Sequence, residues 1–162
     1  FKEDTTPVLS LPSSAEGEKG IQPFAVKAEV VLDYFDGKDS KVDSMTKFEG
    51  VYRANQGMDY SFNKEAFDVL ASFSGEVSDV KEDNIFGKSV TITSKDLSIT
   101  YQSLSDITVK KGDKVNQKDP IAKAGSNIYN KELGNHLHIV VEKNGKIIDP
   151  ELMYGKTNAE IK

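Results

Sequence analysis

The chain has 162 residues, enough for one domain of ordinary size with an arm. A formal charge of -5 and the absence of a Lys/Arg stripe argue against nucleic-acid binding, which needs a basic face. Cysteine is absent, which excludes disulfides, thiolate metal sites and cysteine nucleophiles. No apolar run is long enough to span a bilayer. Because the chain lacks both an initiator Met and a signal segment, we expect a longer protein whose membrane anchor lies in the missing N-terminal part.

Two segments, residues 1–23 and 24–47, are predicted to precede the domain. Residues 1–23 contain three prolines among Ser, Glu, Lys and Gly, a composition that is typical of a flexible arm or linker. Residues 24–47 are predicted to form a short helix and a turn, because the apolar residues between Phe24 and Phe35 have nearly helical spacing. The valines of this segment also suit a strand.

From residue 48 onward, short runs of alternating β-branched or aromatic residues are separated by Gly, Asn and Asp turns. This pattern predicts a compact, mainly β domain over residues 48–155, an antiparallel sandwich with a barrel-like outline, followed by a tail at 156–162. Asn144-Gly145 predicts a type I′ hairpin turn that pairs HLHIVVE with KIIDP.

The only two histidines, His136 and His138, stand two positions apart in the segment GNHLH. On a strand they face the same side, so they could serve one site or be ordinary strand residues. A catalytic zinc has three protein ligands and an open position, and Asp59 in GMDY is the best further candidate.

In combination, GMDY, the segment YQSLSDITVKKGDKV and GNHLH resemble the zinc metallopeptidases of the LytM (M23, lysostaphin-type) family over about residues 48–150. The resemblance implies that Asp59 and His138 correspond to zinc ligands and His136 to a catalytic histidine. Position 55, where the first ligand histidine belongs, is Asn55. A further catalytic histidine is also missing, and Gln102 replaces or displaces it.

These substitutions affect two separate requirements of the chemistry. An amide oxygen at Asn55 suits harder ions than zinc, and Gln102 exchanges no proton near neutral pH. We therefore expect Asp59 and His138 to be a vestigial metal pair, His136 a remnant and no residue catalytic. No cofactor is expected beyond zinc at low occupancy.

Geometry sets a condition on this site. Four residues of straight strand span about 13 Å, so positions 55 and 59 meet only if the chain bends. Gly57 lies between them and predicts a bulge or a close backbone approach. Asn55 could instead cap such a bend by bonding local backbone.

The resemblance is strongest to a degenerate, sporulation-specific branch of the family. It implies a non-catalytic interaction domain of a forespore-membrane protein, lying in the intermembrane space. There it would bind the ectodomain of stage III sporulation protein AH, in a channel or zipper needed for engulfment and forespore development. Edge strands or the segment before Phe48 are candidates for pairing by β-augmentation.

Two alternatives remain open from the sequence. One is an active zinc endopeptidase that cleaves peptidoglycan peptides; the other is a peptidoglycan-binding cleft without hydrolysis. Tyr52, Tyr60 and Tyr101 are predicted to be half-buried strand packing and not a platform for glycans.

Overall fold

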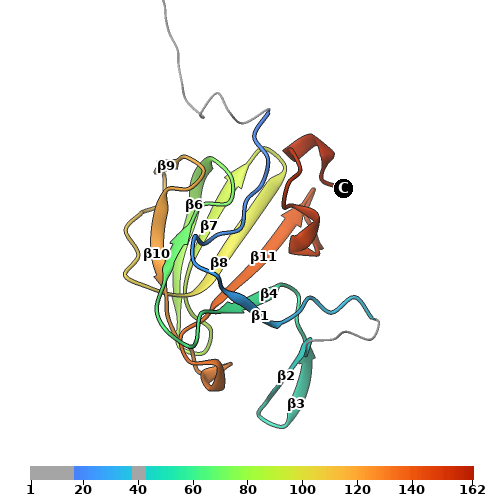
Figure 1. Ribbon diagram of the computed structural model, residues 1–162, viewed down its shortest axis with the longest axis vertical. Helices are drawn as coiled ribbons and strands as arrows, with labels where there is room; N and C mark the ends of the chain where they lie inside the picture. Colours follow the sequence, from blue (N-terminus) through green and yellow to red (C-terminus); the bar gives the residue numbers. More distant parts are fainter. Residues whose placement is uncertain (1–16, 38–42) are drawn as a thin grey trace, which may run out of the picture.

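A computed structural model describes residues 17–37 and 43–162, so most of the predicted arm lies outside the described residues. Almost all regular structure is antiparallel β-sheet, as predicted (Figure 1). The main path of the sheet is β1 (Glu29–Leu32), β4 (Met58–Ser61), β11 (Leu137–Lys143), β8 (Leu97–Ser105), β7 (Gly87–Ser94), β6 (Gly75–Asp83) and β9 (Lys114–Val115).

Three further strands join this path. Strand β10 (Pro120–Ala124) pairs with β5 (Asp68–Leu70) and with the end of β8, and β12 (Lys146–Ile148) pairs with β11. The sheet curls over a core without closing into a barrel in the part of the chain that is described. The predicted Asn144-Gly145 turn is confirmed: both residues have positive φ, and they join β11 to β12.

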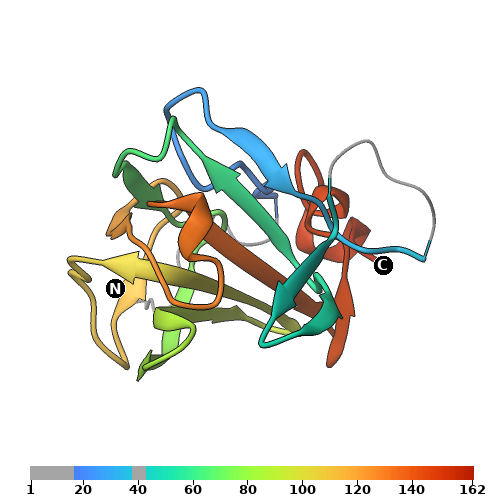
Figure 2. The same ribbon diagram turned by 90° about the horizontal axis from the view of Figure 1, so that it is seen from below.

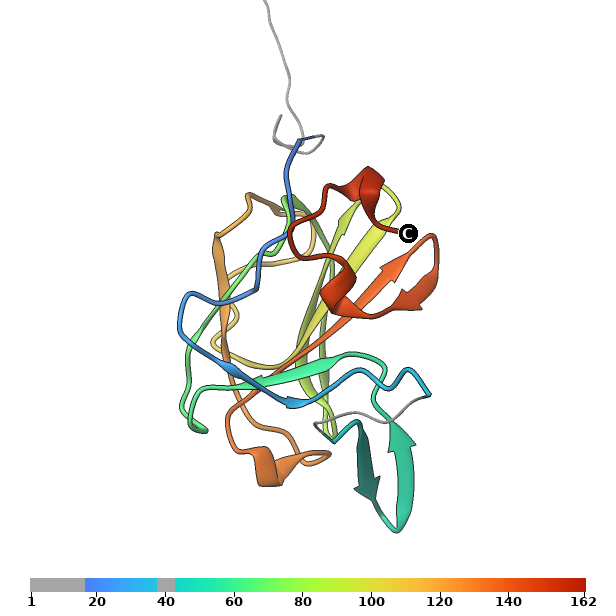
Figure 3. The same cartoon turned by 45° about the vertical axis from the view of Figure 1, so that its right-hand side comes forward.

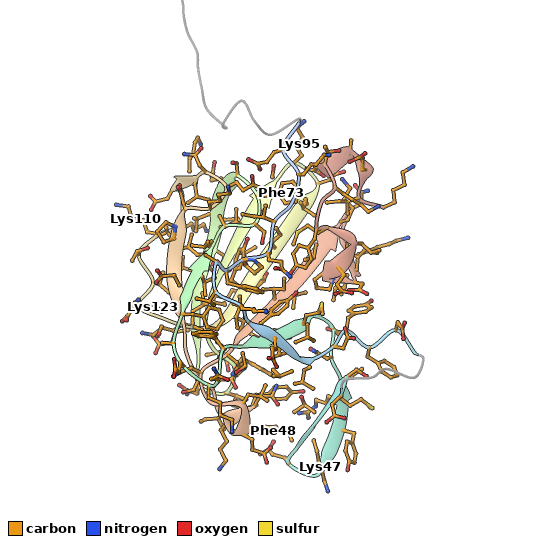
Figure 4. All side chains as sticks on the ribbon, in the orientation of Figure 1. Lys47, Phe48, Phe73, Lys95, Lys110 and Lys123 are labelled. Atoms are coloured by element: carbon orange, nitrogen blue, oxygen red, sulfur yellow. The ribbon has the colours of Figure 1, made fainter. Side chains whose placement is uncertain are left out.

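Alternation along the two central strands separates the core from the outer face of the sheet. In β8, Leu97, Ile99 and Tyr101 are buried, whereas Ser98, Thr100 and Gln102 between them are partly exposed. Strand β11 alternates in the same way. The aromatic ring of Phe73 lies inside the body, while Lys95, Lys110 and Lys123 lie around its rim (Figure 4). His138 therefore belongs to the outer face, opposite the main core.

A separate hairpin, β2 (Met45–Phe48) and β3 (Val51–Ala54), stands away from the main sheet (Figure 3). Its two-residue turn has positive φ at both Glu49 and Gly50, the conformation of a type I′ turn. Phe48 faces the body, where its ring lies 5.3 Å from that of Tyr129. The face of the hairpin that carries Phe48 thus contacts the body.

The helix predicted between residues 24 and 35 is wrong. Residues 29–32 form strand β1, which lies beside β4 with Val30 opposite Tyr60 (Figure 2). Pairing with the backbone of β4 decides in favour of the strand that the two adjacent valines also suited. The tyrosine prediction is also wrong in part, since Tyr60 and Tyr101 are fully buried and Tyr52 is 63% exposed.

The two ends of the described domain are packed together. Lys19 and Gly20 bridge to Thr157 and Tyr154, and the buried carboxylate of Glu18 accepts hydrogen bonds from Ser74. The other short elements are the 3₁₀ turns η2 (Lys131–Leu133), η3 (Pro150–Leu152) and η4 (Asn158–Glu160). Within the described ranges, no helix has the length and apolar character needed to cross a membrane.

Candidate functional site

Three of the predicted site residues form a row across neighbouring strands. His138 on β11 lies directly opposite Asp59 on β4 and, on its other side, directly opposite Gln102 on β8. Directly opposed residues share a face of the sheet, so all three side chains face outward from the main core. Strand register thus brings together residues that are far apart in the sequence.

Asn55 joins this row because the chain bends between β3 and β4. Its Nδ2 donates to Asp59 Oδ1 at 3.0 Å and to the Asp33 carbonyl at 3.1 Å. At Gly57 a Cβ atom would lie 1.9 Å from the carbonyl oxygen of Ile139, so the predicted close backbone approach is confirmed. The structure therefore brings Asn55, Asp59 and His138 together, as the geometric argument required.

The orientation of the Asn55 amide is fixed by its surroundings. A third acceptor, the Leu32 carbonyl, lies 3.4 Å from Nδ2, and Asn55 Oδ1 accepts from the backbone N–H of Gly57 at 3.4 Å. Turning the amide over would place its oxygen against three acceptors. Asn55 therefore presents N–H groups, and not a lone pair, to Asp59.

His138 is tied to the same carboxylate. Its Nδ1 lies 2.9 Å from Asp59 Oδ1 and donates to it, since an ionised carboxylate only accepts. Burial lowers the pKa of His138, but the charge of Asp59 and this hydrogen bond outweigh burial, so the pKa lies above its ordinary value. The Asp59 oxygen that faces His138 thus receives two hydrogen bonds.

His136 is fully buried on the far side of Asp59. Its Nδ1 donates to the Gly134 carbonyl at 2.9 Å, and its Nε2 lies 3.6 Å from Asp59 Oδ2. Burial lowers the pKa of His136, with the charge of Asp59 opposing the shift. Neither Asp59 Oδ2 nor His136 Nε2 has a hydrogen-bond partner among the described residues.

The side chains at this centre do not fit a catalytic zinc. Such an ion needs three protein ligands with free lone pairs. Asn55 directs N–H groups, and not a lone pair, toward the centre. Within residues 17–37 and 43–162, no three His, Cys, Asp or Glu side chains are grouped to hold a metal ion.

A pocket of about 580 Å³ opens above this row. Its floor is formed by the site residues on the sheet, one wall by the β2–β3 hairpin, and the other by Phe86 and the loop around Tyr129. The lining side chains are mostly polar: Thr46, Arg53, Asn55, Gln56, Asp59, Gln102, Asn127, Asn130 and His138. The aromatic rings of Phe86 and Tyr129 lie 4.9 Å apart and continue to Phe48.

The walls of this pocket were not predicted. Arg53 carries a signal in hindsight, since it is the only arginine of the chain and stands two positions before Asn55. Asn127 and Asn130 in SNIYN offered no pattern beyond that of a turn. Their place in the pocket follows from packing between distant segments.

The antiparallel β fold, with an Asp and a His-x-His pair meeting on adjacent strands, places the chain in the class of metallopeptidase-like domains. The model of peptidase family M23 matches residues 53–150, and the chain belongs to that family. Within it, the chain is similar to stage II sporulation protein Q of Bacillus subtilis (strain 168), with 36% identity over 115 residues. The match covers 70% of this chain and 41% of the length of that relative.

Solved structures give the same relationship. A chain of the SpoIIQ–SpoIIIAH pore forming complex is 31% identical, with a TM-score of 0.84, and the match covers 91% of this chain and 97% of that chain. A second SpoIIIAH and SpoIIQ complex matches with a TM-score of 0.77 and 31% identity, over 82% and 98% of the two chains. The catalytic domain of the prophage-encoded M23 protein EnpA from Enterococcus faecalis is 25% identical, with a TM-score of 0.61, over 80% and 94%. The predicted LytM-type fold is therefore confirmed.

Proposed function

We propose that this chain is a non-catalytic, peptidase-like interaction domain of a sporulation protein. The observation that carries the proposal is the contact between Asn55 and Asp59, which puts a hydrogen-bond donor where a metal centre needs a ligand. The ring of His138 bonds to the same carboxylate oxygen, so two side chains engage Asp59 Oδ1. A pocket is retained above a centre that lacks the means to activate water.

The partner proposed for this domain is the ectodomain of a stage III sporulation protein AH-like protein. Two structures of SpoIIQ with SpoIIIAH match most of this chain, which supports the same kind of pairing here. We further propose that the domain lies between forespore and mother-cell membranes, where the pair forms a channel or zipper needed for engulfment and forespore development. The candidate contact surfaces remain the edge strands and the segment before Phe48.

Binding to the purified partner ectodomain tests the interaction. Sedimentation velocity of the mixed proteins at micromolar concentrations should show a complex that neither protein forms alone. Absence of a complex under those conditions would remove the partner from the proposal and leave the fold assignment unchanged.

One observation favours the second candidate, an active zinc endopeptidase acting on peptidoglycan peptides. The buried atoms His136 Nε2 and Asp59 Oδ2 face each other without a donor, an arrangement that a cation would relieve. On that reading Asp59 and His138 would hold zinc, which would supply an activated water, and His136 would lie beside it. A third protein ligand would still be needed.

Metal content after dialysis and digestion of purified cell walls separate the two candidates. The interaction domain should retain less than one equivalent of zinc and release no peptide fragments. Stoichiometric zinc, together with cleavage that is lost in His138→Ala, would establish the peptidase instead.

A further inference from the structure

The hairpin of β11 and β12 leaves one strand edge open. Among the described strands, β12 pairs only with β11, and its register places Lys146 opposite Lys143 across a two-residue turn. Residues that flank such a turn bond to each other, so the next residue, Ile147, directs its N–H and C=O away from β11. In the described part of the chain, no loop or turn residue bonds to the backbone of Ile147.

A groove of about 520 Å³ lies beside this edge, between the hairpin and the C-terminal segment (Figure 3). Its apolar lining consists of Ile148, Ala159 and Ile161. Lys146 and Ile148 are two positions apart on β12, so their side chains share the face that lines the groove. A strand added to the open edge would therefore direct alternate side chains into the groove.

The groove has an excess of positive charge. Three lysines, Lys143, Lys146 and Lys162, line it together with a single acidic residue, Asp96. The charge of Asp96 is matched by Lys143, whose Nζ lies 2.8 Å from its Oδ1. Lys146 and Lys162 are exposed and form no ion pair with an acidic side chain of the described ranges. Two positive charges therefore remain unmatched beside the open strand edge.

From these features we infer that the edge of β12 and its groove bind an extended acidic peptide segment as an added strand. The backbone of Ile147 supplies the main-chain hydrogen bonds. An apolar side chain opposite Ile148 enters the groove, and a carboxylate opposite Lys146 meets the unmatched charge. A second copy of this chain is disfavoured as the occupant, because it brings the same lysines to the edge.

This surface is remote from the pocket above the site. Strand β11 carries His138 near its start and Lys143 at its end, and five residues of strand span about 17 Å. The inference therefore stands or fails independently of zinc and of the proposed sporulation partner. A peptide is favoured over a membrane surface, since lipid-binding surfaces typically gather about four to eight basic residues.

Peptide titrations followed by NMR test the inference. In an antiparallel pair, the acetylated and amidated peptide Thr-Val-Thr-Glu-Thr places its Val opposite Ile148 and its Glu opposite Lys146. One control, Thr-Val-Thr-Gln-Thr, removes the charge, and another, Thr-Val-Glu-Thr-Thr, puts Val and Glu on opposite faces with the same composition. The first peptide should bind about threefold more tightly than either control at low salt, as expected for an exposed ion pair. Equal affinities of the three peptides, or no shifts at millimolar concentrations, would overturn the inference.

Three variants assign the binding to this edge. Lys146→Gln should abolish the preference for Glu over Gln. Ile147→Pro should weaken the binding of all three peptides, because it removes the outward N–H at a place where a strand edge tolerates proline. Lys110→Gln removes a charge across the body from the hairpin and should keep the preference (Figure 4).

The same variants expose the other outcomes. Loss of the preference in Lys110→Gln would refute the assignment to this groove. Sedimentation with phosphatidylglycerol vesicles that is lost in Lys146→Gln, while the peptides give no shifts, would assign the surface to a membrane and overturn the inference. An unchanged spectrum outside the hairpin confirms that each variant is folded.

Discussion

Replacing Asn55 by His should make the stability of the domain depend on zinc. The variant loses the hydrogen bonds that Asn55 gives to Asp59 Oδ1 at 3.0 Å and to the Asp33 carbonyl at 3.1 Å. Buried acceptors left unpaired cost about 1–3 kcal/mol, so we expect the free energy of unfolding without zinc to fall by that amount. An imidazole at this position restores a lone-pair donor beside Asp59 and His138. Zinc at a hundred times its dissociation constant should then return about 2.7 kcal/mol.

Urea unfolding followed by circular dichroism, with and without zinc, measures both effects. The wild-type protein should gain no stability from zinc, and Asn55→His should gain it only in the presence of the ion. Asn55→Ala is the matched control, because it loses the same hydrogen bonds and supplies no ligand. The double variant Asn55→His with His138→Ala should lose the zinc response. Equal zinc stabilisation of the wild type and Asn55→His would refute the view that the Asn55 amide blocks the metal centre.

Three further predictions concern the scaffold around the site. Lys143→Met should lower the free energy of unfolding by about 1–3 kcal/mol in urea titrations, because the buried Nζ of Lys143 donates to the carbonyl and side-chain oxygens of Asn158 at 2.9 and 2.5 Å. A separate hydrogen bond from Lys143 lowers the pKa of Asp96. The stabilisation from the Lys143–Asp96 pair is therefore present above the ordinary carboxyl pKa and is lost as pH falls below about 4. Unfolding free energies measured across that range should show a weaker acid dependence in Lys143→Met than in the wild type. Gly57→Ala should destabilise by about 3 kcal/mol, since its Cβ would meet the Ile139 carbonyl, and a variant as stable as the wild type would contradict the close approach.

Part of the site follows from local rules, whereas the meeting of Asp59 with His138 was expected only from the resemblance to the M23 family. A Gly between Asn55 and Asp59 allows the bend that lets these two residues meet. The turn at Asn144-Gly145 is equally local, because its two positive φ angles depend on those residues alone. These features needed no knowledge of tertiary packing.

The features that were missed depend on contacts between distant segments. Residues 29–32 are short and valine-rich, so periodicity alone did not distinguish a helix from the strand that β4 pairs with. The pocket wall joins Thr46 to Asn130 across 84 positions. Strand register and loop packing create that contact, and neither leaves a periodic pattern in the sequence.

Two hydrogen bonds stabilise the buried carboxylate of Asp59 at the floor of the pocket. Asp59 is only 1% exposed, and an isolated buried carboxylate would cost several kcal/mol. The Nδ2 of Asn55 and the Nδ1 of His138 stabilise its charge through two hydrogen bonds. The centre therefore holds its shape with side chains alone, and the floor of the pocket stays in place under Arg53.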